Sequence, residues 1–289
     1  MLGHDHPVGL DFLVECWWEA INIVEGVVAV SILKETTEVL ERVEEESGIP
    51  VEVTTDPSLP TLASIKIARA PVSHHVLTYN PTKPGVDYHI AYQCGFVLRL
   101  FENPPDERYE FGGTESGRQT VQELLTEQGG IAKKLKLPKA TVKQLADQFF
   151  DGLLTQLRSV PIGMRIDRWI RETYPVLHEA QEASVDRQQR ENAQALNPQI
   201  RQMTPPLVFS DNASMNAAYA IFSERLLGKS QYVIPYRSVG FEERGRALLG
   251  IWDELPSDAR HDRELVDAWA EELELSDWCR WVPLAQWSR

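Results

Sequence analysis

Apolar and polar positions alternate with helical spacing in the first third of the chain. Leu33, Val39, Leu40 and Val43 recur at intervals that place them on one helix face, and Gly48 follows. The pattern predicts one or two helices over residues 10–47. The second of them should end at Gly48, because glycine readily closes the C-terminus of a helix.

Extended segments are predicted next, before a further helix. Residues 51–53 alternate apolar with polar side chains, and prolines at 57 and 60 interrupt the chain. The apolar residues of 65–67 and 76–77 predict two more strands. Residues 86–101 then have the composition of a helix, so the N-terminal part should combine helices with a small sheet.

Most of the chain beyond this part has helical character. Residues 103–118 are rich in Pro, Gly and charge and predict a loop or linker. Helices are expected over 149–157 and from 166, separated by Pro161, and over 178–196, 216–227 and 262–275, with a short extended piece at 231–237 and an aromatic tail at 278–282 that packs in the core. The fold class is therefore α+β, with an N-terminal domain of residues 1–118 and a mostly helical C-terminal domain of residues 119–289.

Residues 73–101 contain a short apolar strand, an Asn80-Pro81 turn and a helix that carries Tyr92-Gln93-Cys94-Gly95-Phe96. In this order of elements, roughly residues 30–102 resemble the ImmA/IrrE-type minimal zinc metallopeptidases. In that family the corresponding helix carries a His-Glu-x-x-His motif. Its two histidines bind zinc, and its glutamate acts as general base.

The residues that perform this chemistry in the family are replaced here. Tyr92, Gln93 and Phe96 occupy the three positions. Neutral glutamine accepts no proton, and phenylalanine has no lone pair for a metal. The resemblance therefore implies an inactive zincin-like fold without metal or cofactor, which binds a protein partner in a bacterial or phage-linked regulatory or defence system. The candidate binding residues are His75, Tyr79, Asn80, His89 and Arg99.

Other metal or catalytic sites find little support in the residues. His74 and His75 are adjacent and should point to opposite faces of a strand, while His89 and Cys94 are five residues apart and share no helix face. There is no Gly-x-Ser-x-Gly elbow and no phosphate-binding loop. A hydrolase whose site has no recognisable motif stays an alternative.

The charge distribution argues against general nucleic-acid binding, with one local exception. The net charge is -14, and residues 35–46 hold six Glu against one Arg, while 242–277 hold twelve acids against four Arg. Such a field repels phosphate backbones. Residues 131–145, however, contain five lysines and no acid, with apolar spacing that resembles a helix-turn-helix. The alternative function is thus a DNA-associated regulator that uses Lys133, Lys134, Lys136, Lys139 and Lys143.

Cellular location follows from what the sequence lacks. No apolar run reaches the ~18 residues of a membrane span, and the first residues lack the basic and apolar regions of a signal peptide. Cys16, Cys94 and Cys279 are widely spaced and odd in number, so free thiols are expected. These features predict a cytoplasmic protein that is not bound to a membrane.

Overall fold

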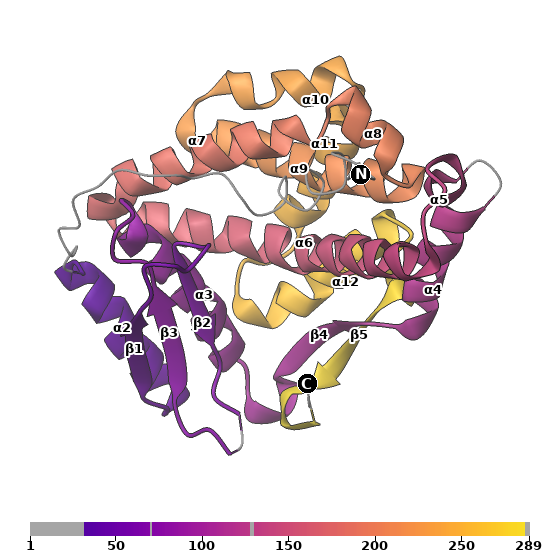
Figure 1. Cartoon of the computed structure of the whole chain (residues 1–289). Helices are drawn as coiled ribbons and strands as arrows, with labels where there is room; N and C mark the ends of the chain where they lie inside the picture. The colour runs from indigo at the N-terminus through magenta and orange to yellow at the C-terminus, as the bar shows by residue number, and fades with distance from the viewer. Residues whose placement is uncertain (1–31, 70, 128–129, 287–289) are drawn as a thin grey trace, which may run out of the picture.

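The computed structural model describes residues 32–69, 71–127 and 130–286. Its fold is mixed α+β: a small sheet with helices comes first, and a mostly helical region follows (Figure 1). The helix expected over the first part of 10–47 lies outside these residues. No helix among the described ones is long and apolar enough to cross a membrane.

The N-terminal sheet has three short strands. α2 (Lys34–Ser47) ends at Gly48, whose φ of 67° is left-handed, as expected for a glycine after a helix. β1 (Val51–Thr55), β2 (Ala63–Lys66) and β3 (His75–Tyr79) follow in the order β1-β3-β2. β1 is parallel and β2 antiparallel to the central β3. The three predicted strands are confirmed.

α3 (Val86–Phe101) packs beside this sheet and α2 (Figure 1). Its buried side, which includes Ile90, Ala91 and Cys94, joins a core with Leu77 of β3. Asp87 fixes the start of α2, because its Oδ1 accepts hydrogen bonds from Leu33 N and Thr36 Oγ1, both at 2.8 Å. The helix predicted over 86–101 is confirmed, and it is held both by the core and by the hydrogen bonds of Asp87 to the start of α2.

Helices make up most of the remaining fold. α6 is the longest and crosses the molecule beside α3, while α9 packs against α11 (Figure 1). The helices are α4 (Glu115–Thr126), α5 (Ile131–Lys134), α6 (Lys139–Thr173), α7 (His178–Gln194), α8 (Pro198–Met203), α9 (Pro206–Leu227), α10 (Ile234–Ser238), α11 (Glu242–Glu254) and α12 (Asp262–Glu272).

The predicted break at Pro161 is wrong, because α6 runs through it. Proline in a helix interior removes one hydrogen bond and costs roughly 3 kcal/mol. Here the apolar faces on both sides of Pro161, including Leu157 and Ile166, are buried in one core. The Pro161 carbonyl also accepts a hydrogen bond from Trp252 Nε1 at 2.9 Å. Burial on both sides of the proline therefore keeps the helix continuous.

Two local predictions in the loops are also wrong. Residues 103–118 are not a plain linker, since β4 (Tyr109–Gly113) pairs antiparallel with β5 (Cys279–Pro283). This pairing joins segments far apart in the sequence, and Trp281 packs edge-on against Phe111 with ring centroids 4.9 Å apart. The piece expected to be extended at 231–237 is helical instead, in a 3-10 turn and α10.

Candidate functional site

The face of α3 that carries Tyr92 is closed by α6. A Cβ built on Gly163 of α6 would overlap the Tyr92 hydroxyl oxygen, so only glycine permits this approach. The reverse holds at Gly95 of α3, where a Cβ would come within 2.6 Å of the Ile166 side chain. The two helices therefore interlock through one glycine each, and burial raises the pKa of Tyr92.

The other two positions at which the resemblance implies zinc-peptidase residues lie near this contact. Phe96 is half-buried, and its ring stands edge-on to Tyr92 with centroids 5.4 Å apart. Gln93 is half-buried as well. No group of three or more His, Cys, Asp or Glu side chains in the described segments is arranged to hold a metal ion. Around Tyr92, α3 thus faces a packed helix.

A buried polar cluster that the sequence patterns did not indicate continues the contact between α3 and α6. Asp167 of α6 accepts hydrogen bonds from Tyr88 Oη at 2.7 Å, Gln181 Nε2 at 3.0 Å and Tyr219 Oη at 3.3 Å. Burial raises the pKa of Asp167 to about 6, although each of these hydrogen bonds lowers it. The cluster connects α3, α6, α7 and α9 around one carboxyl group.

His89, a predicted binding residue, belongs to a second polar contact. Its Nε2 lies 2.8 Å from Ser184 Oγ and 3.4 Å from Arg187 Nη2. Burial, and then the Arg187 charge, lower the pKa of His89 to about 3, so the ring is neutral. A neutral histidine beside a serine hydroxyl could accept its proton. Ser184 is buried, however, so its hydroxyl is not open to a substrate.

His75, Tyr79 and Asn80 lie inside the fold and not on its surface. His75 Nδ1 accepts a hydrogen bond from Ala68 N at 2.9 Å, and burial lowers the pKa of this histidine. Asn80 Nδ2 donates to Pro57 O at 2.8 Å. Tyr79 is buried beside them at the end of β3. The side chains of His75 and Asn80 thus fix the backbone around the sheet.

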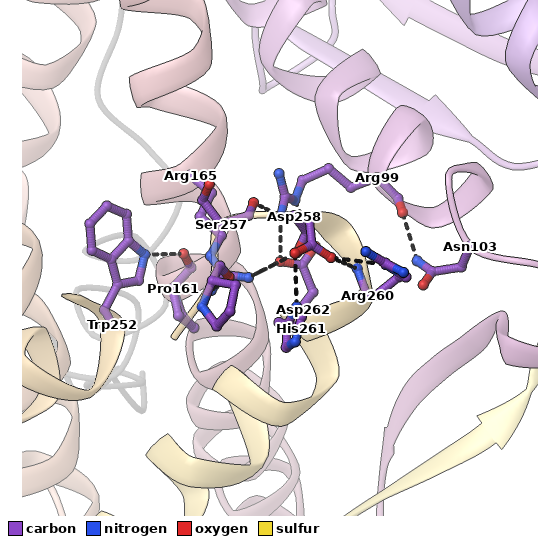
Figure 2. A network of polar contacts seen from close by, with 11 residues as sticks. Arg99, Asn103, Pro161, Arg165, Trp252, Ser257, Asp258, Arg260, His261 and Asp262 are labelled. Atoms are coloured by element: carbon purple, nitrogen blue, oxygen red, sulfur yellow. Dashed lines mark hydrogen bonds and ion pairs between the residues drawn. The ribbon is translucent and has the colours of Figure 1, made fainter. Parts of the chain in front are cut away.

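Arg99 is the predicted binding residue that lies at a cavity, and it is held by a network with α12 (Figure 2). Its Nε and Nη2 donate to Asp262 Oδ2 and Oδ1 at 2.6 and 2.7 Å. Arg165 of α6, whose side chain is 2% exposed, donates to the same carboxylate at 2.7 Å and to Pro256 O at 2.6 Å. Asp262 therefore joins two arginines from helices that are distant in sequence.

Beside this network lies a hollow of about 240 Å³ between α2, α3, α6 and α11. We call it the arginine–tryptophan groove. The Arg168 guanidinium lies over the Trp252 ring, 4.2 Å from its centroid, and Arg42 lies 5.9 Å from that of Trp169. Its charged and aromatic walls are Arg42, Arg99, Glu102, Arg165, Arg168, Trp169, Glu172 and Trp252. No motif in the sequence indicated this site.

The lysine-rich segment forms a short helix, a turn and the start of α6. α5 has a single turn, and Lys136 in the following turn has a φ of 51°, a conformation usual for glycine. The apolar residues Ile131, Val142 and Leu145 are buried. All five side chains of Lys133, Lys134, Lys136, Lys139 and Lys143 are exposed. Leu135, another apolar residue of this pattern, is 50% exposed, and the first helix is a single turn, so the apolar face is only partly buried.

Comparison with known proteins adds no assignment, since no protein family, curated protein or solved structure matches this chain.

Proposed function

We propose that the chain is a non-catalytic protein-binding module whose N-terminal part is a degenerate zincin-like domain. The observation that carries this proposal is the closed contact between Tyr92 of α3 and Gly163 of α6. A zinc peptidase needs an open position beside its metal for water and substrate. In this chain the face of α3 that carries Tyr92 packs against α6, so we place the partner at the sheet instead.

The outer edge of β1 is the surface that we assign to the partner. Pro50 O accepts from His75 N and Asp56 N donates to Tyr79 O, so alternate residues of β1 face β3. The backbone groups of Val53 and Thr55 therefore point away from the sheet. Val53 is 43% exposed, and β1 has no second strand neighbour among the described residues. An extended peptide could add a strand at such an edge.

A Val53→Pro variant tests this assignment in the full-length chain. The substitution removes the outward N–H but leaves the β1–β3 hydrogen bonds in place, and proline is tolerated on edge strands. Val53→Thr, which keeps the N–H and the branched shape, is the matched control. The probe is a random peptide library displayed on phage, and the affinity of enriched peptides is measured by calorimetry.

We expect enriched peptides with alternating apolar residues that bind the original chain and the Val53→Thr variant equally. Val53→Pro should lower the affinity of these peptides by at least about tenfold, the equivalent of one or two lost main-chain hydrogen bonds. Peptides that bind Val53→Pro without loss, or a library that yields none, would refute strand addition at β1.

A DNA-associated regulator is the alternative to this proposal, and the left-handed turn at Lys136 and the exposure of the five lysines are the observations in its favour. The test is duplex binding by fluorescence anisotropy, with Lys133, Lys134, Lys136 and Lys139 changed to Gln. We expect no measurable binding at physiological salt, because the chain carries a net charge of -14. Micromolar binding that disappears in the Gln variant would replace the first proposal with this one.

A further inference from the structure

The arginine–tryptophan groove has an excess of positive charge in an acidic chain. Arg42, Arg99, Arg165 and Arg168 stand against the carboxylates of Glu102 and Glu172 in its walls and of Asp262 behind them. The lining itself holds four cations against two anions, in a chain that carries -14 overall, and Asp262 behind the wall is already paired with Arg99 and Arg165. A small anion should therefore be attracted to the groove.

Two of the four arginines are already committed to structure. Arg99 and Arg165 hold Asp262 and the carbonyls of residues 256 and 257 (Figure 2). They keep the wall in place and contribute charge. Arg42 reaches Glu102 only at 3.6 Å, and both of these side chains are exposed. Their ion pair is therefore weak and can open.

Arg168 is the side chain best placed to receive a ligand. It has no hydrogen-bond or ion-pair partner within the segments that the structure describes, and its guanidinium is stacked on Trp252. Stacking on Trp252 restrains the guanidinium before a ligand arrives, so less conformational entropy is lost on binding. The neighbouring Trp169 adds an apolar surface. The groove thus combines a preoriented guanidinium with aromatic walls.

We propose that the arginine–tryptophan groove binds a single carboxylate group, with Arg168 as its direct partner. An arginine and a carboxylate match in charge and in planar geometry. A volume of about 240 Å³ accommodates one acidic side chain or a small organic acid. The inference is independent of strand addition at β1, because the groove and that edge share no residue.

The test uses NMR of the Trp252 indole N–H in the full chain, assigned with Trp252→Phe. Three probes are titrated: benzoate as a free acid, a capped hexapeptide with one central glutamate, and inorganic phosphate. Arg168→Gln removes the proposed partner. Arg263→Gln is the matched control, since Arg263 also lies over an aromatic ring, 4.7 Å from the Tyr109 centroid, but outside the groove.

We expect a saturable shift with benzoate or with the peptide, and the tighter of the two identifies the source of the carboxylate. Arg168→Gln should weaken binding about tenfold, whereas Arg263→Gln leaves it unchanged. Glu172→Gln should strengthen it, because Glu172 lies one helical turn from Arg168 and repels the ligand. Arg168→Lys keeps the charge but loses the two parallel N–H donors, so its affinity should lie between those of the original chain and of Arg168→Gln.

Three results would overturn the proposal: no saturable shift with either carboxylate, equal affinity in Arg168→Gln, or tighter binding of phosphate than of both carboxylates.

Discussion

Replacing Asp262 by alanine should destabilise the chain far more than replacing an exposed aspartate. The Asp262 side chain is 12% exposed and accepts three charge-assisted hydrogen bonds from Arg99 and Arg165. Without it, Arg165 keeps only the carbonyls of Pro256, at 2.6 Å, and Asp258, at 3.4 Å. Breaking a buried ion pair on one side costs about 3 to 5 kcal/mol.

The loss of stability should lie at the lower end of this range, since Arg99 is 14% exposed and gains hydration when its partner is lost. We therefore expect the free energy of unfolding to fall by about 3 kcal/mol in Asp262→Ala. It should fall by roughly half as much in Asp262→Asn, which keeps one acceptor oxygen but no charge. Arg165 is the group most affected. Its burial disfavours the charged form and lowers its pKa, whereas the negative charge of Asp262 raises that pKa.

Urea unfolding followed by tryptophan fluorescence and circular dichroism measures these changes. Asp253→Ala is the matched control, because its 2.6 Å ion pair with Arg225 is exposed on both sides. That variant should lose under about 0.5 kcal/mol. A loss below about 1 kcal/mol in Asp262→Ala, or one equal to that of the control, would refute the reasoning about the buried network.

Three further predictions concern buried groups and metal. Since burial raises the pKa of Asp167 to about 6, the folded chain keeps a proton on Asp167 that the unfolded chain releases, so the contribution of Asp167 to the free energy of unfolding should fall as the pH rises from about 4 to 6. In Asp167→Asn the pH-dependent loss of unfolding free energy between about pH 4 and 6 should be smaller by up to roughly 3 kcal/mol. A pH dependence of stability equal to that of the original chain would contradict the raised pKa of Asp167. Cys94 is buried and its pKa is raised to about 12, so iodoacetamide should leave it unmodified in the native protein; mass spectrometry that finds it alkylated would be inconsistent with this burial. Protein purified without chelator should carry no stoichiometric zinc by elemental analysis, because Tyr92 and Phe96 stand where the resemblance implies ligands; one zinc per chain would refute the inactive assignment.

The sequence predicted the helices and strands that depend on residues close together along the chain. The end of α2 at Gly48, the three strands and the helix of 86–101 depend on apolar spacing and on glycine, and they are confirmed. The polar helix over 178–196 is present as α7, which ends at residue 194. Its polar character has a structural reason, since Gln181, Ser184 and Gln189 are buried and bonded to neighbouring helices.

The remaining features depend on contacts between distant residues. A helix break was predicted at Pro161 because a proline alone disfavours a continuous helix. The contacts that keep α6 continuous, with Trp252 and with the core, come from distant residues and cannot be seen in the local sequence. β4 and β5 are separated by most of the helical region, so neither has a local partner. The arginine–tryptophan groove likewise assembles four helices, and only Arg99 among its residues was a candidate. Spacing within one segment carries no information on such assemblies.

The central claim is that α6 closes the face of α3 around Tyr92, and a double-mutant cycle tests it most directly. Gly163→Ala introduces a Cβ that overlaps the Tyr92 hydroxyl, so it should lower the free energy of unfolding by about 1 to 3 kcal/mol. Tyr92→Phe removes that hydroxyl. If the helices interlock as described, Gly163→Ala should cost at least ~1 kcal/mol less in the Tyr92→Phe background. Strictly additive effects, or a Gly163→Ala variant as stable as the original chain, would contradict the closed contact.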